Sequence, residues 1–349
     1  MLAIRQLAPK IASKLAPTNP VTSRRAAARP PSLKVSSGKT AQPVKRYRRP
    51  MNDLATPAST TQLCLPYRAP WSWEQFHAHF SLRLLPAVER LTPHSYSRTF
   101  RHGDFSGWLR VRPLADEAAL ELSLSPCPAD LALALVQRVR RMFDLDAEPL
   151  RIAAHFAGDA DLGPLVARHP GLRLPTAFDP FEQAVRAIVG QQVTVKAAVT
   201  ITGRLVARLG EPLPAAGDSG LERLFPTAAA LAEAKLDGIG MPGKRVQTLQ
   251  HFAAQVASGA LRLEPQAGAE ELIERLCALP GIGPWTAEYI ALRAFGEADA
   301  FPASDLGLLK APLWGAAGIS ARQLKARAEA WRPWRAYAAV HLWHNYSGG

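Results

Sequence analysis

The segment at residues 270–311, EELIERLCALPGIGPWTAEYIALRAFGEADAFPASDLGLLKA, constrains the fold more than any other part of this sequence. Apolar residues at helical spacing lie on both sides of the motif Leu-Pro-Gly-Ile-Gly-Pro, which predicts two helices joined by a tight hairpin. We expect Gly281 and Gly283 to turn the backbone at positive φ and Ile282 to enter the core. The proline that follows should begin the second helix, whose unpaired N–H groups would favour an anion such as phosphate. A plain helix-turn-helix corner is the alternative interpretation of so short a motif.

A second signal follows the hairpin, at the sequence Phe-Pro-Ala-Ser-Asp that ends at residue 305. The apolar run at residues 306–309 comes next and predicts a short helix. Ser304 is the predicted N-cap of this helix, which places Asp305 in its first turn. The helix dipole favours a carboxylate at that position. Taken alone, the pattern is also ordinary helix capping.

The hairpin, the spacing and the aspartate together resemble the helix-hairpin-helix DNA glycosylase superfamily, whose full name includes a Gly/Pro-rich hairpin followed by an aspartate. Within it, the chain is most similar to the AlkA-type DNA-3-methyladenine glycosylases II. The resemblance runs from Leu65 to Tyr346, through segments such as PYRAPWSW, GLRLPTAFDPFEQAVRAIVGQQV, GMPGKR and WRPWRAYAAVHLW. It implies a monofunctional glycosylase that hydrolytically releases alkylated purines, such as 3-methyladenine and 7-methylguanine, from double-stranded DNA in base excision repair.

The expected fold class is α+β. Alternating apolar residues between positions 105 and 124 indicate strands of a small antiparallel sheet, and a capping-box signal at residues 72–75 indicates a helix before it. Helical spacing dominates from Pro128 onwards, with no strand signal. We predict a small N-terminal antiparallel-sheet domain at residues 61–145. A two-lobed all-α helix-hairpin-helix glycosylase core should follow at residues 146–349, and the resemblance implies the same division.

Residues 1–60 are predicted to be a disordered basic tail, because they lack sustained periodicity and are rich in Pro, Ser, Ala and basic residues. The chain has 42 basic and 29 acidic residues, yet 12 of the basic residues and none of the acidic ones lie in residues 1–50. The formal charge of +13 therefore describes the tail and does not show that the rest of the chain binds DNA. Three origins stay open: a DNA-binding arm, a targeting peptide, or a start assigned too early, with Met51 as the true start.

The number and spacing of the cysteines indicate whether the chain could hold a metal or an iron–sulfur cluster. Cys64, Cys127 and Cys277 stand singly, without metal-type spacing. Some members of the superfamily hold an iron–sulfur cluster with four cysteines near the C-terminus, where this chain has none. We therefore expect no metal and no cofactor. No apolar run approaches the roughly 20 residues that span a bilayer. A monomeric, DNA-associated cytoplasmic protein of bacterial type, without a membrane partner, is expected.

Asp305 is the predicted catalytic residue, as the resemblance implies. Cleaving an N-glycosidic bond gives the sugar oxocarbenium-like positive charge, which a fixed carboxylate stabilises most in the transition state. In bifunctional members of the superfamily, a nucleophilic lysine stands two residues after the second glycine of the hairpin. Trp285 occupies that position here. An indole cannot form an imine, so direct hydrolysis without strand cleavage is expected.

The resemblance also implies an aromatic pocket for a flipped base. Trp285, Tyr289 and Trp343 would line it, and their faces would attract bases that carry positive charge after alkylation at a ring nitrogen. Leu306 would form an aliphatic wall where a better-known relative has an aromatic residue. Without the resemblance, core packing would be the usual role of such aromatics. Packing is the role that we assign to Trp331.

Three groups of residues are predicted to contact DNA. They are the hairpin residues Gly281, Ile282 and Gly283, the single residue Gln192, and the pair Lys244 and Arg245. Gln192 matches the residue that fills the gap left by the flipped base, and it is polar where the relative has an aliphatic wedge. Lys244 and Arg245 begin a helix after a glycine-rich turn, where a solvated helix end is the alternative.

Two rival functions share parts of this pattern. A glycosylase for deaminated or mismatched bases would keep Asp305 and differ in the pocket. A non-catalytic helix-hairpin-helix DNA-binding protein would need neither the carboxylate nor the aromatic pocket, so both features count against it. Release of free base from methylated DNA distinguishes the three.

Overall fold

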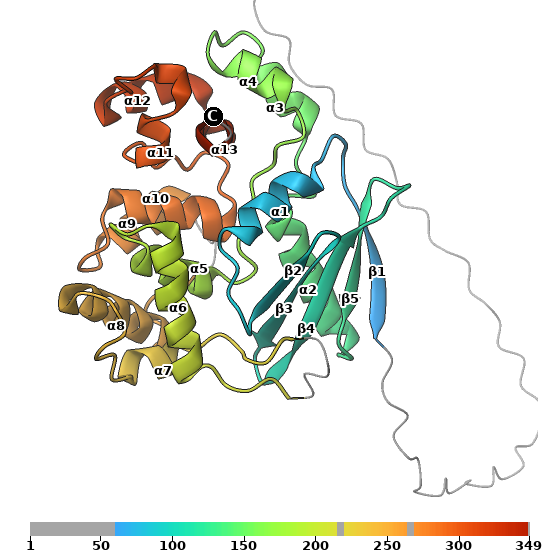
Figure 1. Ribbon diagram of the computed structural model, residues 1–349, viewed down its shortest axis with the longest axis vertical. Helices are drawn as coiled ribbons and strands as arrows, with labels where there is room; N and C mark the ends of the chain where they lie inside the picture. Colours follow the sequence, from blue (N-terminus) through green and yellow to red (C-terminus); the bar gives the residue numbers. More distant parts are fainter. Residues whose placement is uncertain (1–59, 215–219, 264–268, 348–349) are drawn as a thin grey trace, which may run out of the picture. The chain divides into compact units, whose positions relative to one another are not determined.

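The structure is a computed structural model that describes residues 60–214, 220–263 and 269–347 (Figure 1). All of these residues belong to one compact unit. The predicted basic tail lies outside the described residues, apart from residue 60. Among the helices of the described part, none is long and apolar enough to cross a membrane.

An antiparallel sheet of five strands, in the order β1-β5-β4-β3-β2, forms the N-terminal part (Figure 1). The strands are β1 (Thr61–Pro66), β2 (Glu89–Thr92), β3 (Ser95–His102), β4 (Phe105–Pro113) and β5 (Ala119–Leu124). The predicted alternation is confirmed in β4 and β5, where Leu109 and Val111 pack with Leu120, Leu122 and Leu124 in one buried cluster. The α+β fold class is therefore confirmed.

Two helices share that cluster with the sheet, α1 (Trp73–Ser81) and α2 (Ala129–Met142). Ser72 caps α1 as predicted, by accepting a hydrogen bond from the Gln75 backbone N–H at 3.2 Å. The reciprocal half of the capping box was wrong. The Gln75 amide instead exchanges two 2.8 Å hydrogen bonds with the backbone of Arg173, which fastens α1 to the helical part of the chain.

The rest of the described chain is helical, as predicted. Its helices are α3 (Pro149–Phe156), α4 (Leu162–Arg168), α5 (Pro180–Val189), α6 (Val195–Leu209), α7 (Ala228–Glu233), α8 (Gly243–Ala257), α9 (Ala269–Cys277), α10 (Pro284–Ile290), the π-helix η2 (Ala291–Phe295), α11 (Leu306–Leu309), η3 (Pro312–Trp314), α12 (Ala321–Ala328), η4 (Glu329–Trp331) and α13 (Arg335–Ser347).

Two apolar clusters make the predicted two lobes. One contains residues of α3, α4 and α11 to α13, and the other contains residues of α5 to α10. The π-helix η2 belongs to both, because Ala291 and Leu292 pack into the first cluster while Ala294 and Phe295 pack into the second. The segment that directly follows the hairpin helix therefore joins the lobes. The predicted domain boundary at residue 145 stays a prediction.

A buried ion network joins the sheet to α5. Arg98 on β3 contacts Glu182 at 2.5 Å and Glu89 at 3.7 Å, while Arg186 contacts the same two carboxylates at 2.6 and 2.9 Å. Tyr96 donates its hydroxyl to Glu89 at 2.6 Å. Two arginines balance two glutamates, which is the arrangement that buried charges require.

Candidate active site

The hairpin begins with a tight turn at Gly281, whose φ is +83°. A Cβ at this position would stand 2.0 Å from the Thr248 hydroxyl, so the turn also needs the absence of a side chain. Ile282 is buried, as predicted. The positive φ expected at Gly283 was wrong, because this residue is the extended N-cap of α10, with φ −93° and ψ 174°. Pro284 occupies the first turn, as predicted.

The loop after α5 is bonded to the hairpin. Gln191 donates from Nε2 to the Gly281 carbonyl and to the Thr286 hydroxyl, both at 3.0 Å. Its neighbour Gln192 is exposed and has a left-handed backbone with φ +55°, which is costly for a residue with a side chain. Gln192 therefore lies exposed beside the hairpin, and its contact with DNA stays a prediction.

Asp305 is itself the N-cap of α11, so the prediction that Ser304 caps this helix was wrong. The carboxylate receives four donors. Gly307 and Leu308 donate their backbone N–H groups to Oδ1 at 3.0 and 3.3 Å. Trp343 donates its indole N–H to Oδ1 at 2.8 Å, and Trp285 donates to Oδ2 at 3.1 Å. Two helix-terminal donors and two indoles thus fix the orientation of one charge.

Gly307 makes this convergence possible. A Cβ there would lie 3.1 Å from Trp343 Cδ1 and 3.2 Å from Asp305 Oδ1, which is tighter than most contacts of a Cβ atom. The absence of a side chain at this position therefore helps the first turn of α11 to lie directly against the indole.

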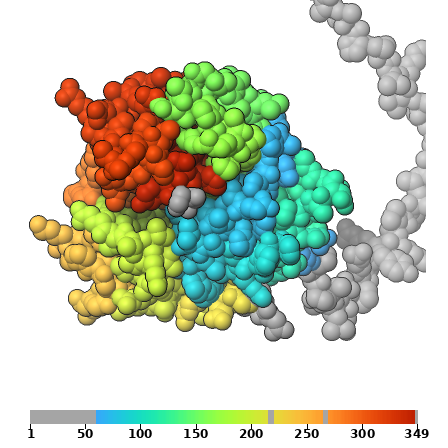
Figure 2. Space-filling view, turned by 45° about the horizontal axis from the view of Figure 1, so that its top comes forward, coloured from blue at the N-terminus to red at the C-terminus, as the bar shows by residue number. Residues whose placement is uncertain are grey.

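Three predicted aromatic residues meet beside Asp305. The rings of Trp285 and Tyr289 are stacked with centroids 5.4 Å apart, and Tyr289 meets Trp343 edge to face at 6.2 Å. All three are partly exposed and line a cleft of about 900 Å³ together with Asp305. Segments far apart in the chain meet around it. Figure 2 shows the N-terminal part in blue, α6 in yellow-green and the C-terminal helix in red on one face of the molecule.

The aliphatic wall expected at Leu306 was wrong for this cleft. With Asp305 as the cap, Leu306 becomes the first helical residue, and it is 66 % exposed. It is absent from the described residues that line the cleft. Val193 and Val195, which sequence reasoning did not single out, line it instead as partly exposed aliphatic residues.

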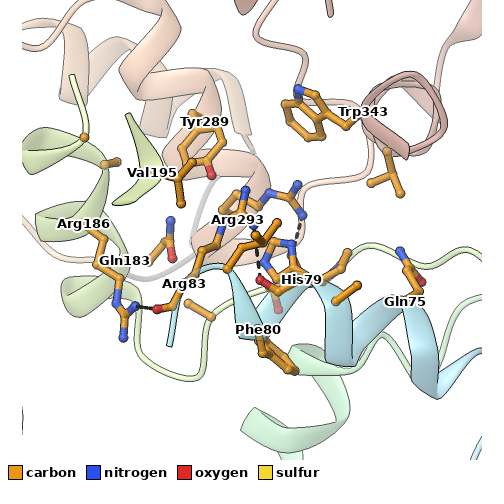
Figure 3. Close-up of a pocket in the computed structure, with 18 of the residues that line it drawn as sticks. Gln75, His79, Phe80, Arg83, Gln183, Arg186, Val195, Tyr289, Arg293 and Trp343 are labelled. Atoms are coloured by element: carbon orange, nitrogen blue, oxygen red, sulfur yellow. Dashed lines mark hydrogen bonds between the residues drawn. The ribbon is translucent and has the colours of Figure 1, made fainter. Parts of the chain in front are cut away.

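Sequence reasoning also missed Arg293, which lies in η2 at the inner side of the cleft (Figure 3). Its side chain is buried, and its guanidinium lies over the Trp343 ring at 4.6 Å and the Tyr289 ring at 5.9 Å. The signal that could have revealed it is a lone arginine in the otherwise apolar run Ala-Leu-Arg-Ala-Phe, one helical turn after Tyr289.

His79 of α1 and Arg83, which follows the end of that helix, also line the cleft (Figure 3). Burial lowers the pKa of His79 well below its ordinary value, and the positive charges of Arg83, Arg293 and Arg186 lower it further. His79 is therefore neutral at physiological pH. Arg83 donates to the His79 carbonyl at 3.2 Å, and Arg186 donates to the Arg83 carbonyl at 2.8 Å.

Lys244 and Arg245 lie away from this cleft, in the first turn of α8. That helix has no side-chain cap at its N-terminus. Lys244 is exposed, and neither residue takes part in an ion pair within the described part of the chain. Trp331 is fully buried, in agreement with the packing role assigned to it.

The described residues offer no group of three or more His, Cys, Asp or Glu that could hold a metal ion. Around the three aromatic rings, the polar groups of the cleft are the Asp305 carboxylate, the Arg293 guanidinium and the indole N–H donors, while the carboxylates of Glu89 and Glu182 are paired with arginines of the buried network. Such a set stabilises charge that develops in a bound molecule, with the carboxylate acting on positive charge and the guanidinium on negative charge.

Comparison with known proteins gives two family matches. Residues 62–179 match the AlkA N-terminal domain, and residues 185–336 match the HhH-GPD superfamily base excision DNA repair protein. The chain is 34 % identical to DNA-3-methyladenine glycosylase 2 of Escherichia coli, over 80 % of this chain and 96 % of that protein. It is 39 % identical to a probable bifunctional transcriptional activator/DNA repair enzyme AlkA of Mycobacterium tuberculosis, over 82 % of this chain.

The chain spans only 57 % of the length of that mycobacterial protein. Among solved structures, 3-methyladenine DNA-glycosylase from Archaeoglobus fulgidus has the same fold, with a TM-score of 0.71 and 23 % identity over 81 % of this chain and 97 % of that chain.

Proposed function

Because this chain belongs to the AlkA-type members of the HhH-GPD superfamily of base excision DNA repair proteins, we propose that it is a monofunctional DNA glycosylase. Its substrate would be double-stranded DNA with alkylated purines, of the 3-methyladenine and 7-methylguanine type. The observation that carries the proposal is the Asp305 carboxylate, held by two indoles and two backbone N–H groups at the edge of an aromatic cleft.

Asp305 acts on the sugar of the flipped nucleotide. As the bond between C1′ and the base nitrogen breaks, its electron pair leaves with the base and C1′ becomes positive. The oxygen of a water molecule then bonds to C1′, and its proton goes to solvent. Oδ1 already accepts three hydrogen bonds, whereas Oδ2 accepts one. Oδ2 is therefore the atom that can face C1′ or the water, while Oδ1 fixes the orientation of the group.

The groups at the cleft support the proposal that the protein has no lyase activity. No lysine is among the described residues that line it, and Trp285 occupies the position that a Schiff-base lysine would need. Without an amine the sugar cannot be held as an imine, so strand cleavage is not expected.

The proposed base pocket consists of Trp285, Tyr289 and Trp343. The proposed DNA contacts are Gly281, Ile282, Gly283, Gln192, Lys244 and Arg245. The protein is proposed to act as a monomer.

The test is release of free base by the full chain from DNA methylated at purine nitrogens. Appearance of 3-methyladenine and 7-methylguanine, with the strand left intact, supports the proposal. Release of hypoxanthine or of a mismatched base alone would support the rival glycosylase. Binding of duplex DNA without release of any base would support a non-catalytic DNA-binding protein.

Replacing Trp343 by Ala is expected to reduce excision of a neutral base such as hypoxanthine more than excision of 7-methylguanine. A neutral base relies on stacking, worth about 1–3 kcal/mol per base, and starts from a higher barrier. A cationic base loses about 0.5–2 kcal/mol of cation–π attraction but leaves easily. Single-turnover rates on two oligonucleotides that differ only in the lesion measure this. Trp343→Phe, which keeps a ring and removes the indole N–H, separates stacking from the bond to Asp305. Equal losses on both lesions would mean that Trp343 only packs.

Replacing Lys244 and Arg245 together by Ala is expected to weaken binding to undamaged duplex DNA and to flatten its salt dependence. Each lost phosphate contact reduces the slope of log K against log salt by about 0.9. Binding isotherms at several salt concentrations measure the slope. Arg110→Ala, which removes an exposed cation from β4, is the control and should leave the slope unchanged. An unchanged slope in the double variant would mean that this helix end is merely solvated.

A further inference from the structure

Arg293 has an environment that packing alone does not require. Its Nη1 donates to the Pro175 carbonyl at 2.9 Å, while Nε is buried without any hydrogen-bond partner among the described residues. A buried polar group normally has its partners. The guanidinium lies over the Trp343 ring, 4.6 Å from its centroid, and the indole N–H of Trp343 donates to Asp305. One aromatic side chain therefore stands between a buried cation and the proposed catalytic carboxylate.

Arg293 differs from the other buried arginines of this region in its charge partners. The arginines of the buried network, Arg98 and Arg186, are matched by Glu89 and Glu182. Arg293 forms no ion pair in the described part of the chain. Burial lowers its pKa to about 10. The Arg83 charge lowers this pKa further, while Tyr289 and the Asp305 charge act in the opposite direction, and Arg293 stays protonated at physiological pH. The inner side of the cleft is therefore cationic.

We propose that Arg293 is a specificity-determining residue, the cation at the base end of the cleft that opposes Asp305 at the sugar end. This inference rests on the proposed glycosylase function. When the glycosidic bond breaks, an electron pair moves from the bond to the base, and the sugar becomes positive. A cation beside the base and an anion beside the sugar both favour this movement, so the pair forms an electric field aligned with the reaction.

The consequence differs between two kinds of base. A neutral base becomes negative in the transition state, and Arg293 stabilises that charge, so excision of neutral bases depends on it strongly. A base alkylated at a ring nitrogen is positive before the reaction and neutral after it. Arg293 repels it in the bound state and the repulsion is relieved as the bond breaks. The cleft thus weakens binding of cationic bases while widening the range of bases that can be released.

The main alternative is that Arg293 only holds Pro175 and fills space. Arg173 provides a control for that role. It is a fully buried arginine whose side chain donates only to backbone carbonyls, and its Nε also has no hydrogen-bond partner among the described residues. It is absent from the residues that line the cleft. Arg293→Met removes the charge at similar volume, Arg293→Lys keeps the charge, and Arg173→Met reports on packing.

The decisive experiment measures binding without catalysis. Two duplexes carry either 2′-fluoro-7-methylguanosine, which is cationic, or 2′-fluoroguanosine, which is neutral, and the fluorine prevents bond cleavage. We expect Arg293→Met to shift the ratio of the two Kd values by about tenfold in favour of the cationic base. Arg293→Lys and Arg173→Met should keep the wild-type ratio. A ratio unchanged in Arg293→Met overturns the inference, even if overall affinity falls.

Single-turnover excision gives the second readout. Arg293→Met should release hypoxanthine about 10–100-fold more slowly than wild type, with half-saturation within threefold, and Arg293→Lys should recover most of the rate. A loss of the hypoxanthine rate that Arg293→Lys does not recover would contradict the inference. Failure of the wild-type protein to release any base would refute the proposed function instead, and the Kd ratio would still decide the role of Arg293 in binding.

Discussion

Single-turnover release of 7-methylguanine should fall at least a hundredfold when Asp305 is replaced by Asn, while the Kd for DNA with an abasic site stays within a factor of ten. The carboxylate stabilises charge that exists only in the transition state, and removal of a group that acts in this way costs about 2.7–4 kcal/mol. Asp305→Ser adds a second test, because serine also caps helices well but has no charge. Both variants should lose the chemical step.

The chain contains a matched control for the hydrogen bonds of Asp305. Asp159 accepts two backbone N–H groups, from Asp161 and Leu162 at 2.9 and 2.8 Å, and the indole N–H of Trp331 at 2.8 Å. It is absent from the residues that line the cleft. Asp159→Asn should therefore lower stability and leave the rate of base release per folded molecule unchanged. If Asp305→Asn kept a tenth or more of the wild-type rate, Asp305 would not be the catalytic residue.

Replacing Arg98 by Met should lower the free energy of unfolding by about 3–5 kcal/mol at pH 7, the cost of leaving buried charges without their partner. Arg98 contacts both Glu182 and Glu89, and all three are buried. Urea denaturation of the full chain measures the loss. Arg112→Met is the matched control on the same sheet, because Arg112 and Glu121 form an exposed pair with two bonds of 2.7 Å. Its loss should cost far less stability than the loss of Arg98, because solvent screens an exposed pair.

The same network gives a pH dependence with a definite sign. Burial by itself raises the pKa of Glu182, but the Arg98 and Arg186 charges outweigh it and lower the pKa below its ordinary value. The folded protein therefore gains stability from this group above the pKa of an unfolded carboxyl, and loses it as the pH falls through the lower folded pKa. The deficit of Arg98→Met should shrink on acidification. A deficit under 1.5 kcal/mol at pH 7, or one that grows in acid, would contradict this account.

The sequence was sufficient for the fold class because its patterns are local. The alternation in β4 and β5, the cap of α1 by Ser72 and the hairpin with buried Ile282 each depend on neighbouring residues. Local patterns were insufficient to identify the N-cap of α11, because two neighbouring residues are equally suitable. Ser304 and Asp305 are both competent N-caps, and the choice fell to Asp305, where the indoles of Trp285 and Trp343 also converge.

Residues whose roles depend on distant segments could not be predicted. Arg293 faces the cleft because η2 is a π-helix, which shifts the side chains that follow α10, and because Trp343 of α13 lies over its guanidinium. His79 and Arg83 face the same space because Gln75 fastens α1 to the backbone of Arg173. The positions of these residues along the sequence do not indicate either contact. The position of Leu306 in α11 differs from the predicted one for a local reason, because the helix begins one residue later than predicted.

Gln191 bonds the loop that carries Gln192 to the hairpin, so two groups proposed to touch DNA cannot separate from each other freely. A repair enzyme that slides along a chromosome meets intact base pairs far more often than damaged ones. The hairpin and Gln192 are held at a fixed spacing. Both can contact DNA at once only where a phosphate and an opening in the stack of bases lie that same distance apart. Intact, well-stacked DNA has no such opening, and the protein moves on. Inspection of the duplex would thus begin before any nucleotide leaves it. The spacing that the protein tests would be set by the hydrogen bonds of the Gln191 side-chain amide.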